Sequence, residues 1–409
     1  MNNTPTRDRS LDLIRSLAII LVCFVHAVNR IYTFTLKGMS GLSAPSFVFG
    51  NMTHALGQMG VPLFFMLTGY LLLSREYNTP KEIFSFWKKK LLPLVICFEI
   101  WTVAYWLMYL LQSVIIDGAP LSVMFTSSVK DPRSLVSLAA HMLMLAHFDI
   151  FRHMWYLPVI IGIYIVLPFF SVLLHKLPAK VHIFPLLVGC FYFFIVPTAN
   201  IFFDATVHST VSARIDFAFV GTHSGLYVLF GYFFKTCLEP VLRSSKKRNT
   251  VIALSAVGAL ISVLLTGLMM CFCYKVGYAT TVPYNFVMLP FFGVSVFSLA
   301  VLTGDRIPLG KVWESVSKAS FGMYFIHYPI LLVLLNLYQL LKKKGRPLGP
   351  MTLFEFPKPL AISVLFAVIF LSSWGITVLI SHFLPSVAKV LFLRKTESKK
   401  DMPAGEKKS

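Results

Sequence analysis

Long apolar segments separated by short polar ones dominate the pattern of this 409-residue chain. Representative segments are Leu11–Phe34, Val251–Phe272 and Leu360–Phe383. Each is long enough to cross a hydrocarbon layer of about 30 Å as a helix that rises about 1.5 Å per residue. The pattern therefore predicts an all-α protein, a polytopic bundle of transmembrane helices.

The apolar segments predict about ten spans, and the charges between them predict their orientation. The spans are placed at 11–34, 47–73, 91–115, 154–174, 182–201, 223–240, 250–273, 284–304, 318–340 and 359–383. Ten spans put both termini on one side, and the segments on that side hold 24 lysines and arginines against 12 on the other. Because positive charge collects at the cytoplasmic ends of spans, both termini are predicted to be cytoplasmic. The basic run Lys342–Arg346 disagrees, because it falls on the outer side.

The domain organisation predicted from this pattern is simple. Residues 1–393 form one membrane-embedded domain, and 394–409 form a basic, disordered cytoplasmic tail with little to bury. The stretch Leu135–Phe148 is expected to be a helix that lies in or dips into the outer interface. The first apolar run is expected to remain as a span, because it lacks the small-residue cleavage site of a signal peptide.

Composition agrees with this class. The chain is 56% hydrophobic and only 13% charged, whereas soluble domains carry roughly 25% charged residues. These values exclude a disordered chain, a coiled coil and an ordinary soluble enzyme. The net charge of +20 would suggest nucleic acid in a soluble protein, but here the orientation of the spans accounts for it, so no nucleic acid is expected. The six cysteines lie in or beside apolar runs and form neither a disulfide framework nor a zinc pattern, so no metal is expected.

Ionisable residues inside spans are costly and therefore mark candidate functional positions. Arg15 and His26 in the first span are eleven residues apart. On a helix this separation is ~16 Å of rise and ~1100° of turn, only ~20° from a whole number of turns. Both side chains are therefore predicted to lie on one face, and Arg30 extends the polar stripe outward by one turn.

The stripe suggests a division of tasks. Arg15 near the cytoplasmic end has the planar fork that suits phosphate groups of an anionic donor. His26, deeper in the membrane, is suited to act as a base or nucleophile. Structural alternatives remain for both. Arg15 can pair with Asp12 one turn away, and His26 can hold helices together by hydrogen bonds.

Other polar residues in or near spans are further candidates. Glu99 is the carboxylate inside the predicted third span, where it can orient a histidine or pair with an arginine. His327 lies within the ninth span, and it is as well suited to a structural role as to binding. His153, Trp155 and Tyr156 begin the fourth span, either as interface anchors or as residues that contact a sugar ring.

A basic inner loop follows the second span. It contains Arg75, Lys88, Lys89 and Lys90. Such a loop is expected from topology and from contact with anionic lipids. The alternative is that it adds to a cytoplasmic phosphate-binding site beside Arg15.

Four segments are similar to motifs of one known family. Arg15 and His26, with ten residues between them, match an R-x10-H signature. Residues 60–72, GVPLFFMLTGYLL, are similar to VPLFF-x-[ST]-GYL, and Arg75 follows them.

The other two motifs lie further along the chain. His153-Met-Trp-Tyr is similar to H-[LM]-W-[FY], and residues 320–327, SFGMYFIH, are similar to SFGIY-x-x-H. Because the four motifs occur in order over 11–335, the chain resembles the acyltransferase family 3 membrane O-acyltransferases. It is most similar to the stand-alone O-acetyltransferases of enterobacterial common antigen or O-antigen, which have no appended extracytoplasmic domain.

The resemblance implies a multi-pass enzyme of the bacterial cytoplasmic (inner) membrane. It implies transfer of an acyl group, usually acetyl, from cytoplasmic acyl-CoA to a hydroxyl of a cell-surface glycan or its lipid-linked precursor. Arg15 and His26 would be the essential pair, with Arg75 and Trp155 in support. Glu99 and the three lysines are added from polarity alone. The expected partners are acyl-CoA, the glycan acceptor and membrane lipids, with no tightly bound cofactor.

Two other functions remain open at this point. A transporter or flippase for a glycan or lipid intermediate also fits ten spans with buried polar residues, and it predicts no dependence on CoA and tolerance of Arg15→Lys. A non-catalytic membrane scaffold leaves the alignment of Arg15 with His26 unexplained.

Overall fold

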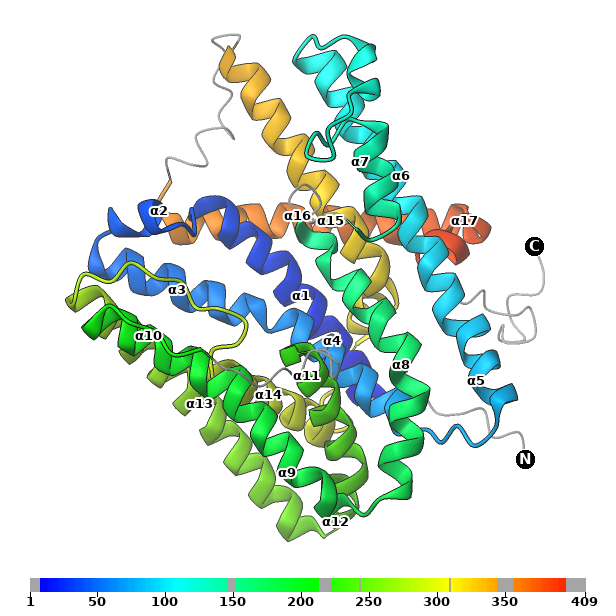
Figure 1. The fold of residues 1–409 in the computed structure, drawn as a ribbon, viewed down its shortest axis with the longest axis vertical. Helices are drawn as coiled ribbons and strands as arrows, with labels where there is room; N and C mark the ends of the chain where they lie inside the picture. The colour runs from blue at the N-terminus through cyan, green and yellow to red at the C-terminus, as the bar shows by residue number, and fades with distance from the viewer. Residues whose placement is uncertain are drawn as a thin grey trace. The chain divides into compact units, whose positions relative to one another are not determined.

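The computed structural model describes residues 8–145, 152–212, 222–242, 244–308, 310–343 and 356–394 (Figure 1). Every regular element in these ranges is helical, which confirms the all-α prediction. The chain divides into two compact units, each built from separate parts of the sequence. Unit 1 combines Met1–Ser85, Val159–Ser317 and Gly349–Val368, and unit 2 combines Phe86–Pro158, Lys318–Leu348 and Ile369–Ser409.

The helices of the two units are as follows. Unit 1 contains α1 (Arg9–Ile31), α2 (Leu36–Ser40), α3 (Ala44–Gln58), α4 (Gly60–Thr68), the π-helix η1 (Gly69–Leu73), most of α5 (Pro80–Phe86), most of α8 (Tyr156–Lys176), α9 (Ala179–Cys190), η5 (Phe191–Ile195), α10 (Val196–Val207), α11 (Thr222–Phe233), η7 (Phe234–Leu238), α12 (Glu239–Val241), α13 (Ser245–Lys275) and α14 (Met288–Thr303). Unit 2 contains η2 (Trp87–Leu91), α6 (Leu92–Ile116), η3 (Leu121–Phe125), α7 (Leu135–Met142), η4 (Arg152–Trp155) and α17 (Pro385–Leu391). Two long helices, α15 (Lys311–Lys343) and α16 (Lys358–Phe383), run through both units.

Eight helical segments among the described residues are long and apolar enough to cross a membrane. They are Arg9–Ile31, Ala44–Leu73, Pro80–Ile116, His153–Lys176, Lys180–Val207, Ser245–Lys275, Lys311–Leu337 and Lys358–Phe383. They coincide with eight of the ten predicted spans. The span predicted at 284–304 corresponds to α14, a shorter apolar helix of 16 residues. The span predicted at 223–240 corresponds to the consecutive helices α11, η7 and α12.

The prediction of a basic inner loop was wrong for its second half, because residues 80–91 are helical. Thr79 and Glu82 form a capping box. The Glu82 carboxylate accepts hydrogen bonds from the backbone N–H groups of Asn78 and Thr79, at 2.7 and 3.0 Å. The Thr79 hydroxyl accepts a hydrogen bond from the Glu82 N–H at 3.3 Å. The helix therefore starts at Pro80, and the lysines of this segment lie on its surface.

Two other predictions are tested only in part. A helix is present within the predicted 135–148 as α7, which begins where the Ser134 hydroxyl accepts a hydrogen bond from the Ser137 N–H, and its place at the outer interface stays a prediction. Residues 146–148 lie outside the described residues, as does the predicted disordered tail apart from Arg394.

In unit 1, α1 packs against α3, α4 and α14 (Figure 1). The approach is close because glycines face α1. A Cβ on Gly57 would lie 2.7 Å from the Cβ of Val25, and a Cβ on Gly60 would lie 2.6 Å from the carbonyl oxygen of Ala18. As the chain advances along α3 and α4, its partners on α1 move back toward the N-terminus. This span therefore runs antiparallel to α1.

A second close crossing joins the end of this span to α11. A Cβ on Gly69 would collide with the carbonyl group of Val228, and a Cβ on Gly231 would collide with the carbonyl group of Met66. Small residues allow the backbones of membrane helices to approach one another in this way. The two glycines therefore set the spacing of α4 and α11.

The close crossing of α4 and α11 leads to a prediction about stability. Gly231→Ala is expected to destabilise the protein by about 1–3 kcal/mol, because the added methyl group forces two packed backbones apart. Gly162→Ala on α8 is the matched control, since nothing lies within 4 Å of its Cβ position. Thermal unfolding of the two variants in detergent compares them. Equal unfolding temperatures would show that the crossing does not limit stability.

Candidate active site

The N-terminal end of α1 holds a buried carboxylate beside a partly exposed arginine. Asp12 is only 4% exposed. Its Oδ1 accepts a hydrogen bond from the Ser317 hydroxyl on α15 at 2.7 Å, and it lies 3.4 Å from Nη1 of Arg15. A buried carboxylate is costly unless it is paired and hydrogen-bonded. The two contacts therefore stabilise Asp12 and fix the position of the guanidinium.

Two further hydroxyl groups fasten this end of α1 to its neighbours. The Ser16 hydroxyl donates a hydrogen bond to the Trp313 carbonyl at 3.1 Å, and the Ser10 hydroxyl donates one to the Val301 carbonyl at 3.1 Å. The side chain of Arg15 is 32% exposed. The end of α1 that carries Arg15 is therefore held firmly by its neighbours, while the guanidinium remains accessible to a ligand.

His26 and Arg30 lie on the same helix as Arg15. Because α1 is unbroken from Arg9 to Ile31, the separation of eleven residues places Arg15 and His26 on one face. His26 is half-buried, whereas Arg30 is exposed in the last turn. The geometry of the predicted stripe is thus present in the helix.

Arg75 follows η1 at the end of the second span. Because this span is antiparallel to α1, Arg75 lies on the side of unit 1 where α1 begins. Its side chain is exposed, and Nε donates a hydrogen bond to the Leu71 carbonyl at 2.9 Å. The Arg75 carbonyl in turn accepts a hydrogen bond from the Ser171 hydroxyl on α8. Arg75 therefore satisfies a carbonyl group at the end of its helix. The exposed remainder of its guanidinium adds positive charge on the side of unit 1 where Arg15 lies.

In unit 2, two predicted histidines come together in an aromatic cluster. The ring centroids of His153 and His327 are 5.8 Å apart, and the rings are perpendicular. His153 stacks on Tyr328 at 4.1 Å and contacts Tyr105 at 4.7 Å. Both histidines are buried. The cluster joins η4, α6 and α15, which carry segments far apart in the sequence.

The neighbours of His153 belong to the same cluster. The Tyr324 hydroxyl donates a hydrogen bond to the His153 carbonyl, and its ring lies 5.8 Å from that of Tyr156. Trp155 and Tyr156 are half-buried. The two motifs that begin at His153 and Ser320 are therefore packed directly against one another.

Glu99 lies on α6 in unit 2. The residue is half-buried, and among the described residues its Oε2 has no hydrogen-bond partner. On either side of it, the Cys97 thiol and the Trp101 indole donate hydrogen bonds to the Leu391 carbonyl at 3.1 and 3.0 Å. This part of α6 is therefore anchored to the C-terminal end of α17. The role of Glu99 in orienting a histidine stays a prediction.

Lys88, Lys89 and Lys90 are exposed on the π-helix η2. They belong to unit 2, together with Glu99, His153, Trp155, Tyr156 and His327. Arg15, His26, Arg30 and Arg75 belong to unit 1. The predicted residues thus divide between the two units, and contacts bring His153 and His327 together. The functional roles of all of them remain predictions.

Sequence reasoning missed the residues that support these groups. Ser317 carries no distinguishing signal, because a serine in an apolar helix is common and its partner is more than 300 positions away. Tyr105, whose hydroxyl donates a hydrogen bond to the Phe325 carbonyl at 2.6 Å, looks like an interface tyrosine in the sequence. A detectable signal was present only for Tyr324, which lies inside the motif at 320–327.

The bond between Ser317 and Asp12 is open to test. Ser317→Ala is expected to cost about 1–3 kcal/mol of stability, because a buried carboxylate loses a hydrogen-bond donor. Ser317→Thr keeps the hydroxyl and should recover most of the loss. Unfolding temperatures of the solubilised protein give the comparison. If the alanine and threonine variants are equally stable, the hydroxyl does not support Asp12.

Comparison with known proteins identifies the family to which the chain belongs. A family model described as an acyltransferase domain matches residues 8–378. No curated protein and no solved structure matches the chain. The matched range includes α1, the aromatic cluster and nearly all of the apolar helices. The chain therefore belongs to acyltransferase family 3 and is a multi-pass membrane acyltransferase.

Proposed function

We propose that this protein transfers an acyl group, acetyl by preference, from cytoplasmic acyl-CoA to a hydroxyl of a cell-surface polysaccharide or its lipid-linked precursor. The observation that carries the proposal is the face of α1. There Arg15 is held by Asp12 near one end of a span, and His26 lies eleven residues further on. Membership of the family supports acyl transfer. The face of α1 carries a cation at Arg15 and a base at His26, at two different depths along the span.

Arg15 is the proposed anchor of the donor. Acyl-CoA carries a diphosphate and a 3′-phosphate, and a guanidinium binds phosphate oxygens through two parallel hydrogen bonds. The contact with Asp12 presents the fork in a fixed orientation, and its exposure leaves room for a phosphate. Arg75 and the exposed lysines 88–90 add positive charge for the same ligand.

His26 is the proposed base for the acceptor. A sugar hydroxyl is a weak nucleophile at neutral pH, and its oxygen attacks the thioester carbonyl as its proton passes to the imidazole. The carbon–sulfur bond then breaks, and CoA leaves as the thiol or thiolate. Direct transfer and transfer through an acyl group held on the protein both meet these requirements. No metal is needed, because the thioester is already activated.

The residues of unit 2 are proposed to position substrate. His153, Trp155, Tyr156 and His327 supply rings and ring nitrogens of the kind that contact sugars, and Arg30 is proposed to meet the acceptor at the end of α1. Glu99 is proposed to support the reaction by orienting a histidine or pairing with an arginine. We also propose that the protein lies in the bacterial cytoplasmic membrane, with both termini inside and membrane lipids around the spans.

Acyl transfer can be measured directly. Membranes that contain the wild type are expected to move label from radiolabelled acetyl-CoA to acceptor glycan, and His26→Ala is expected to lose this activity by about 100-fold or more. His382→Ala is the matched control, because His382 is exposed on α16. Equal labelling by all three proteins would keep the enzyme class and remove His26 from the chemistry. No transfer by any of them would favour transport.

Arg15→Lys separates the donor role from a general need for charge. Lysine keeps the charge but loses the planar fork. The KM for acetyl-CoA is expected to rise by about tenfold or more, with a smaller change in the KM for the acceptor. Steady-state kinetics with varied acetyl-CoA tests this. Unchanged kinetics would contradict the donor role and agree with a transporter.

A further inference from the structure

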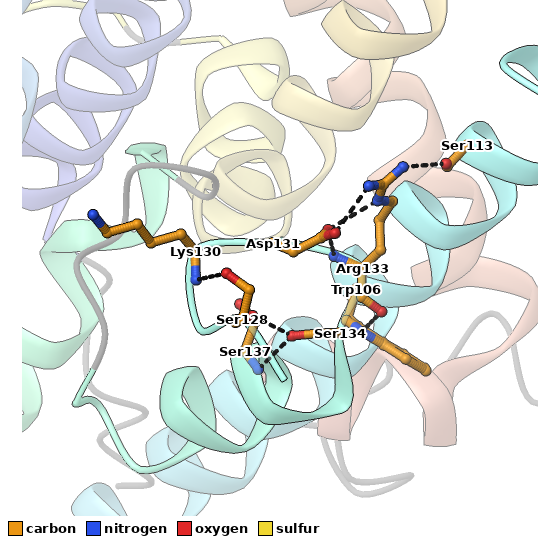
Figure 2. Close-up of polar contacts among 8 residues, drawn as sticks. All are labelled: Trp106, Ser113, Ser128, Lys130, Asp131, Arg133, Ser134 and Ser137. Carbon is orange, nitrogen blue, oxygen red and sulfur yellow. Dashed lines mark hydrogen bonds and ion pairs between the residues drawn. The ribbon is translucent and has the colours of Figure 1, made fainter. Parts of the chain in front are cut away.

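A polar cavity lies at the C-terminal end of α6, within unit 2. Its volume is about 540 Å³. It is formed by the last turns of α6 and by the segment that leads to α7 (Figure 2). Its lining consists of Tyr109, Gln112, Ser113, Asp117, Ser128, Lys130, Asp131, Pro132 and Arg133. None of these residues belongs to the groups assigned above to the reaction.

The cavity has a rigid wall. Arg133 donates hydrogen bonds from Nε and Nη2 to the two carboxylate oxygens of Asp131, at 2.8 and 2.9 Å, and from Nη1 to the Ser113 hydroxyl at 3.0 Å. The Arg133 carbonyl accepts a hydrogen bond from the Trp106 indole at 3.1 Å. Figure 2 shows the guanidinium held between Asp131 and Ser113. The ion pair thereby fastens the connecting segment to α6.

The segment is also tied to α7. The Ser134 hydroxyl donates a hydrogen bond to the Ser128 carbonyl at 2.7 Å and accepts one from the Ser137 N–H at 2.9 Å. The Lys130 N–H donates to the Ser128 hydroxyl at 3.2 Å. These contacts hold the part of the lining between Ser128 and Arg133 in place.

The charges of the cavity cancel. The lining contains two carboxylates, Asp117 and Asp131, and two cations, Lys130 and Arg133, and Asp131 pairs directly with Arg133. Hydrogen bonds from Arg133 lower the pKa of the Asp131 carboxyl, and Asp131 and then Asp117 raise the pKa of the guanidinium. The ion pair consequently persists at neutral pH and is lost only as the pH falls through the lowered pKa of Asp131. A phosphate ligand would need an excess of cations, which this cavity lacks.

The remaining lining groups match a polyhydroxylated ligand. Each sugar hydroxyl both donates and accepts hydrogen bonds, and the cavity offers a carboxylate at Asp117 and a carboxamide at Gln112. Oε1 of Gln112 is shielded from solvent and has no hydrogen-bond partner among the described residues. The Tyr109 ring adds a flat apolar surface for the C–H groups of a sugar.

The cavity adjoins the aromatic cluster along α6. Tyr105, which contacts His153, lies one helical turn before Tyr109, about 6 Å along the same face. Gln112 and Ser113 follow after one more turn. One face of α6 thus connects the two histidines to the cavity. The connectivity of the predicted spans puts this end of α6 on the outer side of the membrane.

We propose that this cavity is a binding site for an uncharged saccharide unit of the acceptor glycan. The saccharide bound here is a different sugar of the glycan from the one that receives the acyl group. Its binding positions the glycan for the reaction. The assignment rests on the proposed function for its substrate class. The residues involved are binding residues, with Asp117 and Gln112 as the groups that recognise hydroxyls.

Binding can be tested without catalysis. Saturation-transfer NMR on the full-length, detergent-solubilised protein uses lactose, cellobiose and N,N′-diacetylchitobiose as probes, in the absence of acyl-CoA. At least one disaccharide is expected to bind the wild type. Its affinity should fall by about tenfold in Asp117→Ala and in Gln112→Ala, because each variant loses hydrogen-bonding groups.

The controls separate this proposal from loss of folding and from loss of catalysis. Thr126→Ala changes an exposed residue of the same segment outside the cavity and should bind as the wild type does. The unfolding temperature of each variant shows that it is folded. His26→Ala should also keep binding. A wild-type protein that binds saccharide but transfers no acyl group would overturn the proposed function alone.

Three results would overturn the proposal. These are no binding of any of the three disaccharides by the wild type, binding by both cavity variants that equals that of the wild type, and displacement of a bound disaccharide by inorganic phosphate. Steady-state kinetics with the natural glycan gives a second readout. Asp117→Ala should raise the KM for the acceptor by about tenfold and leave the KM for acetyl-CoA unchanged.

Discussion

The arrangement of unit 1 depends on one requirement. A carboxylate buried in an apolar helix must be stabilised by hydrogen-bond donors or a cation from neighbouring residues. Asp12 meets this requirement through Ser317 on α15 and Arg15 on its own helix. Both contacts are short-range and directional, so they fix the height and rotation of α1. Together with the packing of α1 against α3 and α4, they hold the face of α1 that carries His26. The pair is thus a structural feature as well as the support of the proposed donor site.

The motifs that resemble the family have a packing role alongside their chemical one. Gly60 and Gly69 let a span approach α1 and α11 at backbone distance, and no larger residue fits there without moving a helix. Tyr324 binds the carbonyl of His153, which joins two motifs that are far apart in the sequence. The spacing between the motifs is therefore set in part by residues that pack helices together.

The sequence predicted the spans because burial of apolar side chains and the length of a span are local properties. The alignment of Arg15 with His26 followed from helical periodicity alone. The loop prediction failed at residues 80–91 because charge was given more weight than the capping box at Thr79 and Glu82. The contacts of Ser317 and Tyr105, and the cavity beside Arg133, depend on partners distant in sequence, so no pattern within a segment contains them.

Charge distinguishes the two ligands of the proposed reaction. The proposed CoA donor carries several negative charges, and the groups proposed to bind it (Arg15, Arg75 and the lysines on η2) are all cationic. The cavity at the end of α6 instead balances two cations with two carboxylates, of which Asp131 pairs directly with Arg133, and it keeps many hydrogen-bonding groups. A net charge of +20 would by itself draw phosphate to any open cavity. Local neutralisation by Asp117 and Asp131 is therefore the feature that reserves this one for an uncharged, hydroxyl-rich ligand.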